Sequence, residues 1–186
     1  MNLVKIFITG RPGVGKSTLI GHILEYLQFK KVSVGGIITP EVREKGRRIG
    51  FKIVDLMSNE SDFLASIYIK SNYRVGKYYI NLDALHRIGI NALDVAIKKA
   101  QVIIVDEIGK MELISNEFKR KLIDSFAVKK PVIATIGLYF VKSFINEVKK
   151  RVNSSVLVYE LTRENFNHIK KSIVDKLGLN NHQKLF

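Results

Sequence analysis

The sequence predicts an α/β fold in which helices cover both faces of a mostly parallel central sheet. Short apolar runs alternate with amphipathic stretches along most of the chain, an order typical of strands joined by crossover helices. A fully apolar run at residues 102–105 is typical of a central strand that is buried on both faces. A glycine-rich turn at residues 10–17 joins the first apolar run to the first amphipathic stretch. Ligands of such sheets bind beyond the carboxyl ends of the strands, so this turn marks the expected site.

The glycine-rich turn follows an apolar run at residues 3–8 and fits the phosphate-loop pattern G-x-x-x-x-G-K-[ST]. Its three glycines can adopt backbone angles that a Cβ would forbid, so the chain can curl and point several N–H groups at one phosphate chain. Lys16 is expected to act in catalysis by neutralising charge on the outer phosphates, and Ser17 to offer a hydroxyl to Mg²⁺. The residues expected to bind the nucleotide in this loop are Gly10, Arg11, Pro12, Gly13, Val14, Gly15, Lys16, Ser17 and Thr18.

Hydrophobic periodicity predicts the remaining elements of the layered fold. The expected strands are residues 3–8, 32–39, 102–105, 131–136 and 155–160. The first expected helix runs from the loop to about residue 29, and the second covers residues 81–100 with a break at Gly89. A third helix is expected to have Ser115 as its N-cap, and a fourth to cover residues 140–152. The last is expected at residues 165–177, with Thr162 as its cap and Gly178 at its end. Residues 1–178 are expected to form one domain, with 179–186 as a loose C-terminal tail.

An antiparallel insertion is expected in the first half of the chain. Residues 37–42 and 48–56 are expected to pair as a β-hairpin around Gly46. Residues 63–69 are expected to add another strand. Residues 73–80 are aromatic and basic with an internal glycine, and we expect a loop there that reaches the site.

Several cations of this insertion are candidates for contact with the nucleotide. Arg43, Arg48 and Lys77 flank the expected turns. An arginine near the terminal phosphate would stabilise charge in the transition state of phosphoryl transfer. The alternative is that these residues are paired charges on an exposed hairpin.

A phosphate loop needs an acidic partner at the end of another apolar strand before it can support hydrolysis. Asp106 is expected to end the strand at residues 102–105, with its carboxylate facing the phosphates, and to hold Mg²⁺ directly or through water. Glu107 is expected to bind at the same place and to accept a proton from the attacking water. The alternative is a solvated acidic pair that caps the strand.

Four segments together resemble one family. They are GRPGVGKST, TPEVREKGRRIGF, VGKYYINLD and VDEIGKMEL, the last followed by SNEFK. They are similar to the THEP-type nucleoside-triphosphatases, which include the human cancer-related nucleoside-triphosphatase. The resemblance implies a three-layer P-loop NTPase fold, RecA-like or kinase-like, and hydrolysis of nucleoside triphosphates with broad base preference. It implies that residues 10–17 bind phosphates, that Asp106 serves Mg²⁺ and that Glu107 activates water.

The chain departs from this family near its end. The family often closes with T-x-E-N-R, whereas here Phe166 follows Thr162, Arg163, Glu164 and Asn165. A nucleotide contact made by the family's arginine would therefore be lost or transferred to Arg163.

The sequence thus predicts a Mg²⁺-dependent nucleoside-triphosphatase that converts ATP, GTP and other NTPs to NDP and phosphate. One alternative is a small-molecule or nucleoside kinase, which would close an arginine-rich lid over the phosphates. Another is a nucleotide-gated module that binds RNA or protein, supported by the net charge of +14. The basic residues are scattered, which favours an ordinary solvated surface.

Composition bounds the class of protein further. There are no cysteines, so disulfides and thiol chemistry are excluded. No apolar run approaches the length of a membrane span, and the first residues form the phosphate-binding strand rather than a signal peptide. We therefore expect a cytoplasmic protein without a membrane partner. We also expect a monomer.

Overall fold

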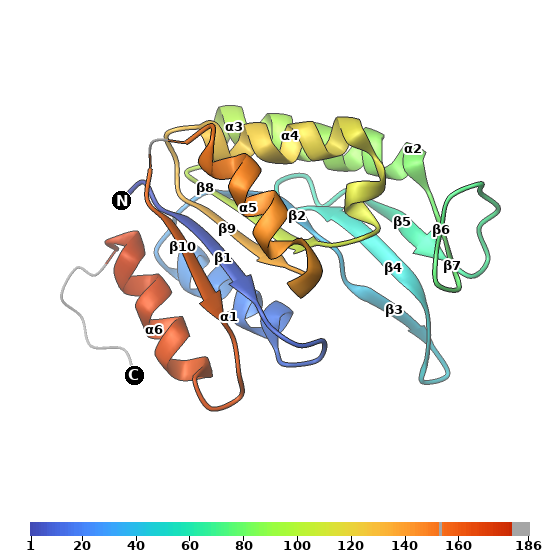
Figure 1. The fold of residues 1–186 in the computed structure, drawn as a ribbon, viewed down its shortest axis with the longest axis horizontal. Helices are drawn as coiled ribbons and strands as arrows, with labels where there is room; N and C mark the ends of the chain where they lie inside the picture. Colours follow the sequence, from blue (N-terminus) through green and yellow to red (C-terminus); the bar gives the residue numbers. More distant parts are fainter. Residues whose placement is uncertain (153, 180–186) are drawn as a thin grey trace.

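The computed structural model describes residues 1–152 and 154–179. Within these residues ten strands form one mixed sheet, in the order β10-β1-β9-β8-β2-β4-β5-β7-β6, with β3 paired to β4 (Figure 1). The first five strands of this order run parallel, and the rest form an antiparallel extension. This arrangement confirms the predicted α/β class, with its mostly parallel central sheet and antiparallel insertion.

The parallel part of the sheet carries the phosphate loop. Its strands are β10 (Val156–Glu160), β1 (Lys5–Thr9), β9 (Val132–Ile136), β8 (Val102–Ile108) and β2 (Val34–Ile38). Because all five run in the same direction, their carboxyl ends lie along one edge. The residues that follow β1, β2, β8 and β9 therefore meet there, as expected for an open α/β sheet.

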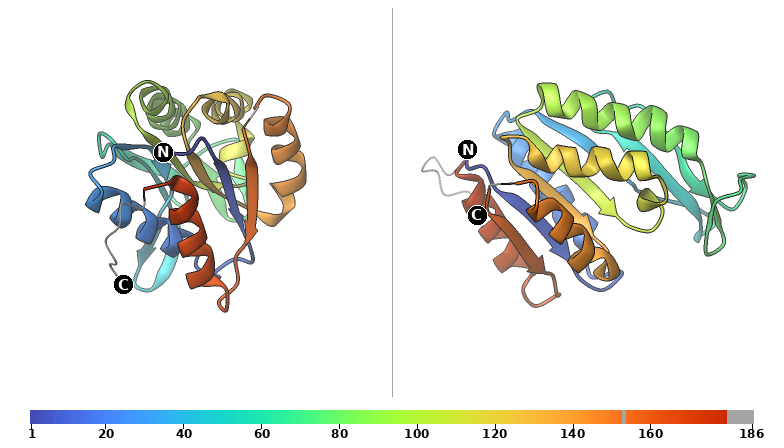
Figure 2. Two further views of the ribbon diagram at one scale, coloured as in Figure 1. Left: turned by 90° about the vertical axis from the view of Figure 1, so that its left-hand side faces the viewer. Right: turned by 45° about the horizontal axis from the view of Figure 1, so that its top comes forward.

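Helices form the two outer layers (Figure 2). Helices α1 (Lys16–Phe29) and α6 (Phe166–Leu177) pack on one face of the parallel strands. Helices α3 (Asn91–Lys99), α4 (Asn116–Ala127) and α5 (Val141–Lys149) cover the other face. No helix of the described part of the chain is long and apolar enough to cross a membrane.

The antiparallel extension starts with the predicted hairpin. Strands β3 (Glu41–Glu44) and β4 (Arg47–Asp55) pair around Gly46, and β4 also pairs with β2, where Ile37 lies opposite Asp55. The additional strand, predicted at residues 63–69, is β5 (Ser61–Ser66), which begins and ends earlier. The hairpin prediction is confirmed.

The prediction of a loop at residues 73–80 is wrong. This segment is a second hairpin, β6 (Arg74–Val75) and β7 (Tyr78–Ile80), and β7 pairs with β5. The two-residue turn begins with Gly76 at a φ of 59°, which is the backbone angle that such hairpins favour at glycine. The run of Tyr78, Tyr79 and Ile80 has high strand propensity and completes the open edge of β5.

Helix boundaries follow the sequence with two corrections. The stretch at residues 81–100 starts as α2 (Leu82–Ala84), and Gly89 lies in a π-helical turn (Leu85–Ile90) that leads into α3 without a break. A side chain at Gly89 would meet Ile53 and Phe118 at 2.8 Å, so the glycine permits close packing rather than a break. Ser115 accepts a hydrogen bond from the N–H of Phe118, which confirms the predicted N-cap of α4.

The last helix begins differently from the prediction. Asn165, not Thr162, directly precedes α6, and the Thr162 hydroxyl accepts from the N–H of Asn165 inside the preceding turn. Gly178 ends the helix with a left-handed φ of 65°, as predicted. Apart from Leu179, the tail predicted at residues 179–186 lies outside the described residues.

Lys5 occupies an unusual position at the start of β1. Its side chain is fully buried, and its Nζ donates to the carbonyl oxygens of Val128 and Lys130 at 2.6 and 2.5 Å. Burial lowers the pKa of this amine to about 8. The ammonium thus ties the start of β1 to the turn that follows α4.

Candidate active site

The phosphate loop joins β1 to α1, as the sequence predicted. Gly10, Gly13 and Gly15 adopt φ values of 146°, 75° and 105°, all in the region that favours glycine. A Cβ at Gly10 would lie only 2.6 Å from the carbonyl oxygen of Leu161. The glycines therefore permit both the curl of the loop and its close approach to the end of β10.

Lys16 lies at the centre of the site. Its side chain is buried, and Nζ donates to the carbonyl oxygen of Gly10 at 3.3 Å. Its positive charge acts to lower the pKa values of both Asp106 and Glu107, against the effect of burial. The lysine therefore lies between the phosphate loop and the two carboxylates, where it can neutralise either a phosphate or an acid.

The prediction that Asp106 ends its strand is wrong. Strand β8 continues to Ile108, because Ile108 pairs with Ile136 of β9, whereas the pairing of β8 with β2 stops at Asp106. The ladder with β9 on the other side shifts between Val105 and Ile108. Asp106 and Glu107 thus occupy an irregular stretch inside the strand, still at the carboxyl edge of the sheet.

The carboxylate of Asp106 meets two hydroxyl groups. It accepts hydrogen bonds from Thr135 on β9 and from Ser17 of the phosphate loop. Burial raises the pKa of Asp106, and these two hydrogen bonds together with the charge of Lys16 act in the opposite direction. The oxygens of Ser17 and Asp106, the two expected ligands of Mg²⁺, therefore lie side by side.

Glu107 lies beside Asp106 in a less enclosed position. Its backbone N–H donates to the hydroxyl of Thr39 at 3.1 Å. A Cβ at Gly137, just beyond β9, would lie 3.6 Å from its Oε1, so little space separates this carboxylate from the end of β9. Burial raises the pKa of Glu107, and the charge of Asp106 raises it further while Lys16 lowers it. A raised pKa makes this carboxylate a stronger proton acceptor.

Sequence reasoning missed three residues that shape this site. Thr39, after β2, donates to the carbonyl oxygen of Asp106 at 2.9 Å, and Thr135 donates to its carboxylate. Glu112 is buried near the acidic pair, and its Oε2 accepts from the N–H of Gly109 at 2.9 Å. The threonines could have been found in the sequence only from their position, because both lie at the ends of apolar strands that reach the sheet edge where Asp106 lies.

Glu112 makes stability depend on pH. Burial, with help from the charges of Glu107 and Asp106, raises its pKa to about 8 from an ordinary 4.5, although backbone N–H groups oppose the shift. Between these two pH values the folded protein binds more protons than the unfolded chain. The free energy of unfolding is therefore expected to fall as pH rises through this window, by up to about 1.4 kcal/mol per pH unit.

Glu112→Gln removes this titration and is expected to make the fall shallower in urea unfolding measured across the window. Glu160→Gln, at an exposed position of β10, is the matched control and is expected to keep the wild-type slope. Equal slopes in wild type and Glu112→Gln would contradict the assignment.

The other cations singled out from the sequence have partners elsewhere. Arg43 and Arg48 both form ion pairs with Glu41, and Arg48 also donates to the hydroxyl of Tyr78 at 3.0 Å. Lys77 lies 5.4 Å from the centre of the Tyr78 ring. These contacts agree with the alternative of an exposed hairpin with paired charges.

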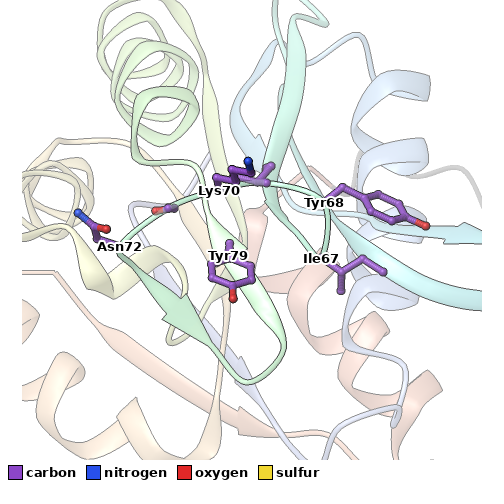
Figure 3. A pocket seen from close by; sticks show the side chains of 7 residues that line it. Ile67, Tyr68, Lys70, Asn72 and Tyr79 are labelled. Carbon is purple, nitrogen blue, oxygen red and sulfur yellow. The ribbon is translucent and has the colours of Figure 1, made fainter.

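A separate pocket of about 650 Å³ lies at the far end of the sheet (Figure 3). Tyr68, Lys70, Asn72 and Tyr79 are among the residues that line it, in the segment after β5 and on β7. Four strands stand between β1 and β5 in the sheet, so the pocket is remote from the phosphate loop. It holds none of the site residues predicted from the sequence.

A phosphate loop on β1 and a carboxylate pair on β8, with β9 between them, define the class of P-loop nucleotide-binding proteins. A family model described as "NTPase" matches residues 5–174. A nucleoside-triphosphatase THEP1 of Thermotoga maritima is 44% identical over 184 residues, covering 97% of this chain and 99% of the relative. One from Methanothermobacter thermautotrophicus is 38% identical over 175 residues, covering 94% and 97%. The chain belongs to this family of nucleoside-triphosphatases.

Two solved structures share the fold. The crystal structure of THEP1 from the hyperthermophile Aquifex aeolicus superposes with a TM-score of 0.77 at 34% identity, covering 93% of this chain and 98% of the other. The solution structure of a human cancer-related nucleoside triphosphatase gives a TM-score of 0.77 at 33% identity, covering 97% and 99%. The resemblance noted from the sequence motifs is thereby confirmed.

Proposed function

We propose that the protein is a Mg²⁺-dependent nucleoside-triphosphate phosphohydrolase that converts NTPs to NDP and phosphate with broad base preference. The observation that carries this proposal is the meeting of Lys16, Ser17, Asp106 and Glu107 at one edge of the sheet. The name nucleoside-triphosphatase, which the curated relatives bear, supports the same reaction.

The phosphate loop binds the triphosphate. The N–H groups of the curled loop and the first turn of α1 supply donors and the positive end of a helix dipole. Lys16 adds a full positive charge where the terminal phosphates would lie. Because its Nζ is already held by the Gly10 carbonyl oxygen, little reorganisation is needed when substrate binds.

The oxygen donors of this site fit Mg²⁺. The described residues contain no cluster of three or more His, Cys, Asp or Glu side chains that could form a complete metal cage. Mg²⁺ needs no such cage, since it keeps several waters and binds through one or two protein oxygens plus substrate phosphates. Ser17 and Asp106 would hold it, and the bound ion would neutralise charge on the phosphate oxygens.

Glu107 is the general base of this proposal. Asp106 is occupied by hydrogen bonds from Thr135 and Ser17, whereas no hydrogen bond to the Glu107 carboxylate is found among the described residues. Glu107 would accept a proton from the water that attacks the terminal phosphorus in line with the leaving diphosphate.

Since one chain supplies all these groups, we also propose that it acts as a monomer, in the cytoplasm where NTPs are abundant.

Phosphate release tests this proposal. Enzyme mixed with ATP, GTP, CTP or UTP and Mg²⁺, without any acceptor, is expected to release phosphate from all four. EDTA is expected to stop release and added Mg²⁺ to restore it. Absence of release, or release of γ-phosphate only to an added nucleoside, would overturn the proposal in favour of a kinase.

A further inference from the structure

We infer that the nucleoside end of the substrate leaves the phosphate loop toward β10 and that its base stacks on Phe166. This inference rests on the proposed function, because it takes the phosphate loop to hold a nucleotide. It assigns recognition of the base to a residue at which the chain departs from the T-x-E-N-R pattern.

Strand order sets the direction of the bound nucleotide. The phosphate loop follows β1, and the two carboxylates that serve the terminal phosphate lie on β8, beyond β9. Strand β10 is the other neighbour of β1. With the terminal phosphate directed toward β9 and β8, the ribose and base extend to the opposite side, where β10 ends. The turn from β10 to α6 lies at the same edge as the phosphate loop (Figure 1).

This turn is in contact with the phosphate loop. The N–H of Leu161 donates to the carbonyl oxygen of Thr9 at 2.8 Å, directly before the loop begins. The ring of Phe166 lies 3.5 Å from the position that a Cβ on Gly15 would occupy. Phe166 is therefore the aromatic side chain that borders the loop on the side where the base is expected.

Hydrogen bonds hold the turn in place before any ligand binds. The N–H of Thr162 donates to Oδ1 of Asn165 at 2.8 Å, and the side-chain amide of Asn165 donates to the carbonyl oxygen of Glu160 at 2.9 Å. The ring of His22 on α1 lies edge-to-face against Phe166, with centroids 5.9 Å apart. Phe166 is half-buried, so part of its ring stays accessible.

An aromatic platform explains broad base preference in physical terms. Every base has a π-face, so stacking on Phe166 needs no hydrogen-bond pattern that distinguishes one base from another. The competing explanation is that Phe166 only packs against the apolar residues between α1 and α6. The two explanations differ in whether an aliphatic side chain can replace the ring.

The two explanations, base stacking and apolar packing, are distinguished by measuring the binding of ADP and of inorganic tripolyphosphate to a Phe166→Leu variant. Leucine keeps the apolar packing but has no π-face, and tripolyphosphate has phosphates but no base. Calorimetry in the presence of Mg²⁺ is expected to show about a tenfold rise in the Kd for ADP and an unchanged Kd for tripolyphosphate. Phe29→Leu, at an exposed end of α1, is the control and is expected to keep both wild-type values.

An unchanged ADP affinity in Phe166→Leu would overturn the inference. An equal loss of ADP and tripolyphosphate affinity would also overturn it, because it would show damage to the loop rather than loss of stacking. Both readouts measure binding alone. Absence of NTP hydrolysis in the wild type would therefore count against the proposed function and leave this test unaffected.

Discussion

Glu107→Gln is expected to lower kcat for NTP hydrolysis by about 100-fold or more, with little change in KM. Glutamine keeps the size of the side chain but cannot accept the proton of the attacking water. The phosphate loop, Lys16 and the Ser17–Asp106 pair are untouched, so substrate binding is expected to persist. Steady-state phosphate release measured over a range of ATP concentrations gives both constants.

The same substitution is expected to leave the folded state at least as stable. Burial and the charge of Asp106 raise the pKa of Glu107, so its ionised form is disfavoured in the folded protein. A neutral side chain removes that cost. Glu160→Gln, at an exposed position of β10, controls for a general effect of losing one carboxylate. Hydrolysis at the wild-type rate by a folded Glu107→Gln variant would refute the role of Glu107.

Lys16→Met is expected to reduce both kcat and nucleotide affinity, with a loss of about 100-fold or more in kcat/KM. Methionine preserves much of the packing at this buried position but carries no charge. The terminal phosphates then lose their positive partner, and the pKa values of Asp106 and Glu107 rise because Lys16 no longer lowers them. Calorimetry with ADP and phosphate-release kinetics measure the two losses.

The two variants are expected to differ in kind. Glu107→Gln acts on turnover alone, whereas Lys16→Met also weakens binding. Lys52→Met, on an exposed position of β4, controls for the removal of one positive charge. A Lys16→Met variant that binds ADP as tightly as the wild type would show that the lysine serves the transition state only.

Local patterns were sufficient for the parts of the molecule that depend on neighbours in sequence. The strand, curled loop and helix at residues 5–29 follow from glycine placement and apolar spacing, and the structure has them at nearly the predicted bounds. The hairpin of β3 and β4 followed from a turn glycine between two strand-like runs. The acidic pair was found because it directly follows an apolar run.

Contacts between strands that are distant in the sequence could not be predicted from local patterns. Thr39 and Thr135 are 67 and 29 residues away from Asp106, and only the order of β2, β8 and β9 in the sheet brings them together. The hairpin of β6 and β7 was missed for a similar reason. Its strands are very short and gain their stability from the edge of β5, which the sequence does not reveal.

The buried amine of Lys5 can be used to measure local opening of the structure around β1. Above a pH of about 8 its amine is mostly neutral and therefore nucleophilic, yet the side chain is fully enclosed. An acylating reagent can reach it only when β1 or the turn at residues 128–130 moves and the amine leaves the carbonyl oxygens of Val128 and Lys130. The rate of acylation at this position therefore reports how often the contact between the start of β1 and this turn opens, without any engineered label.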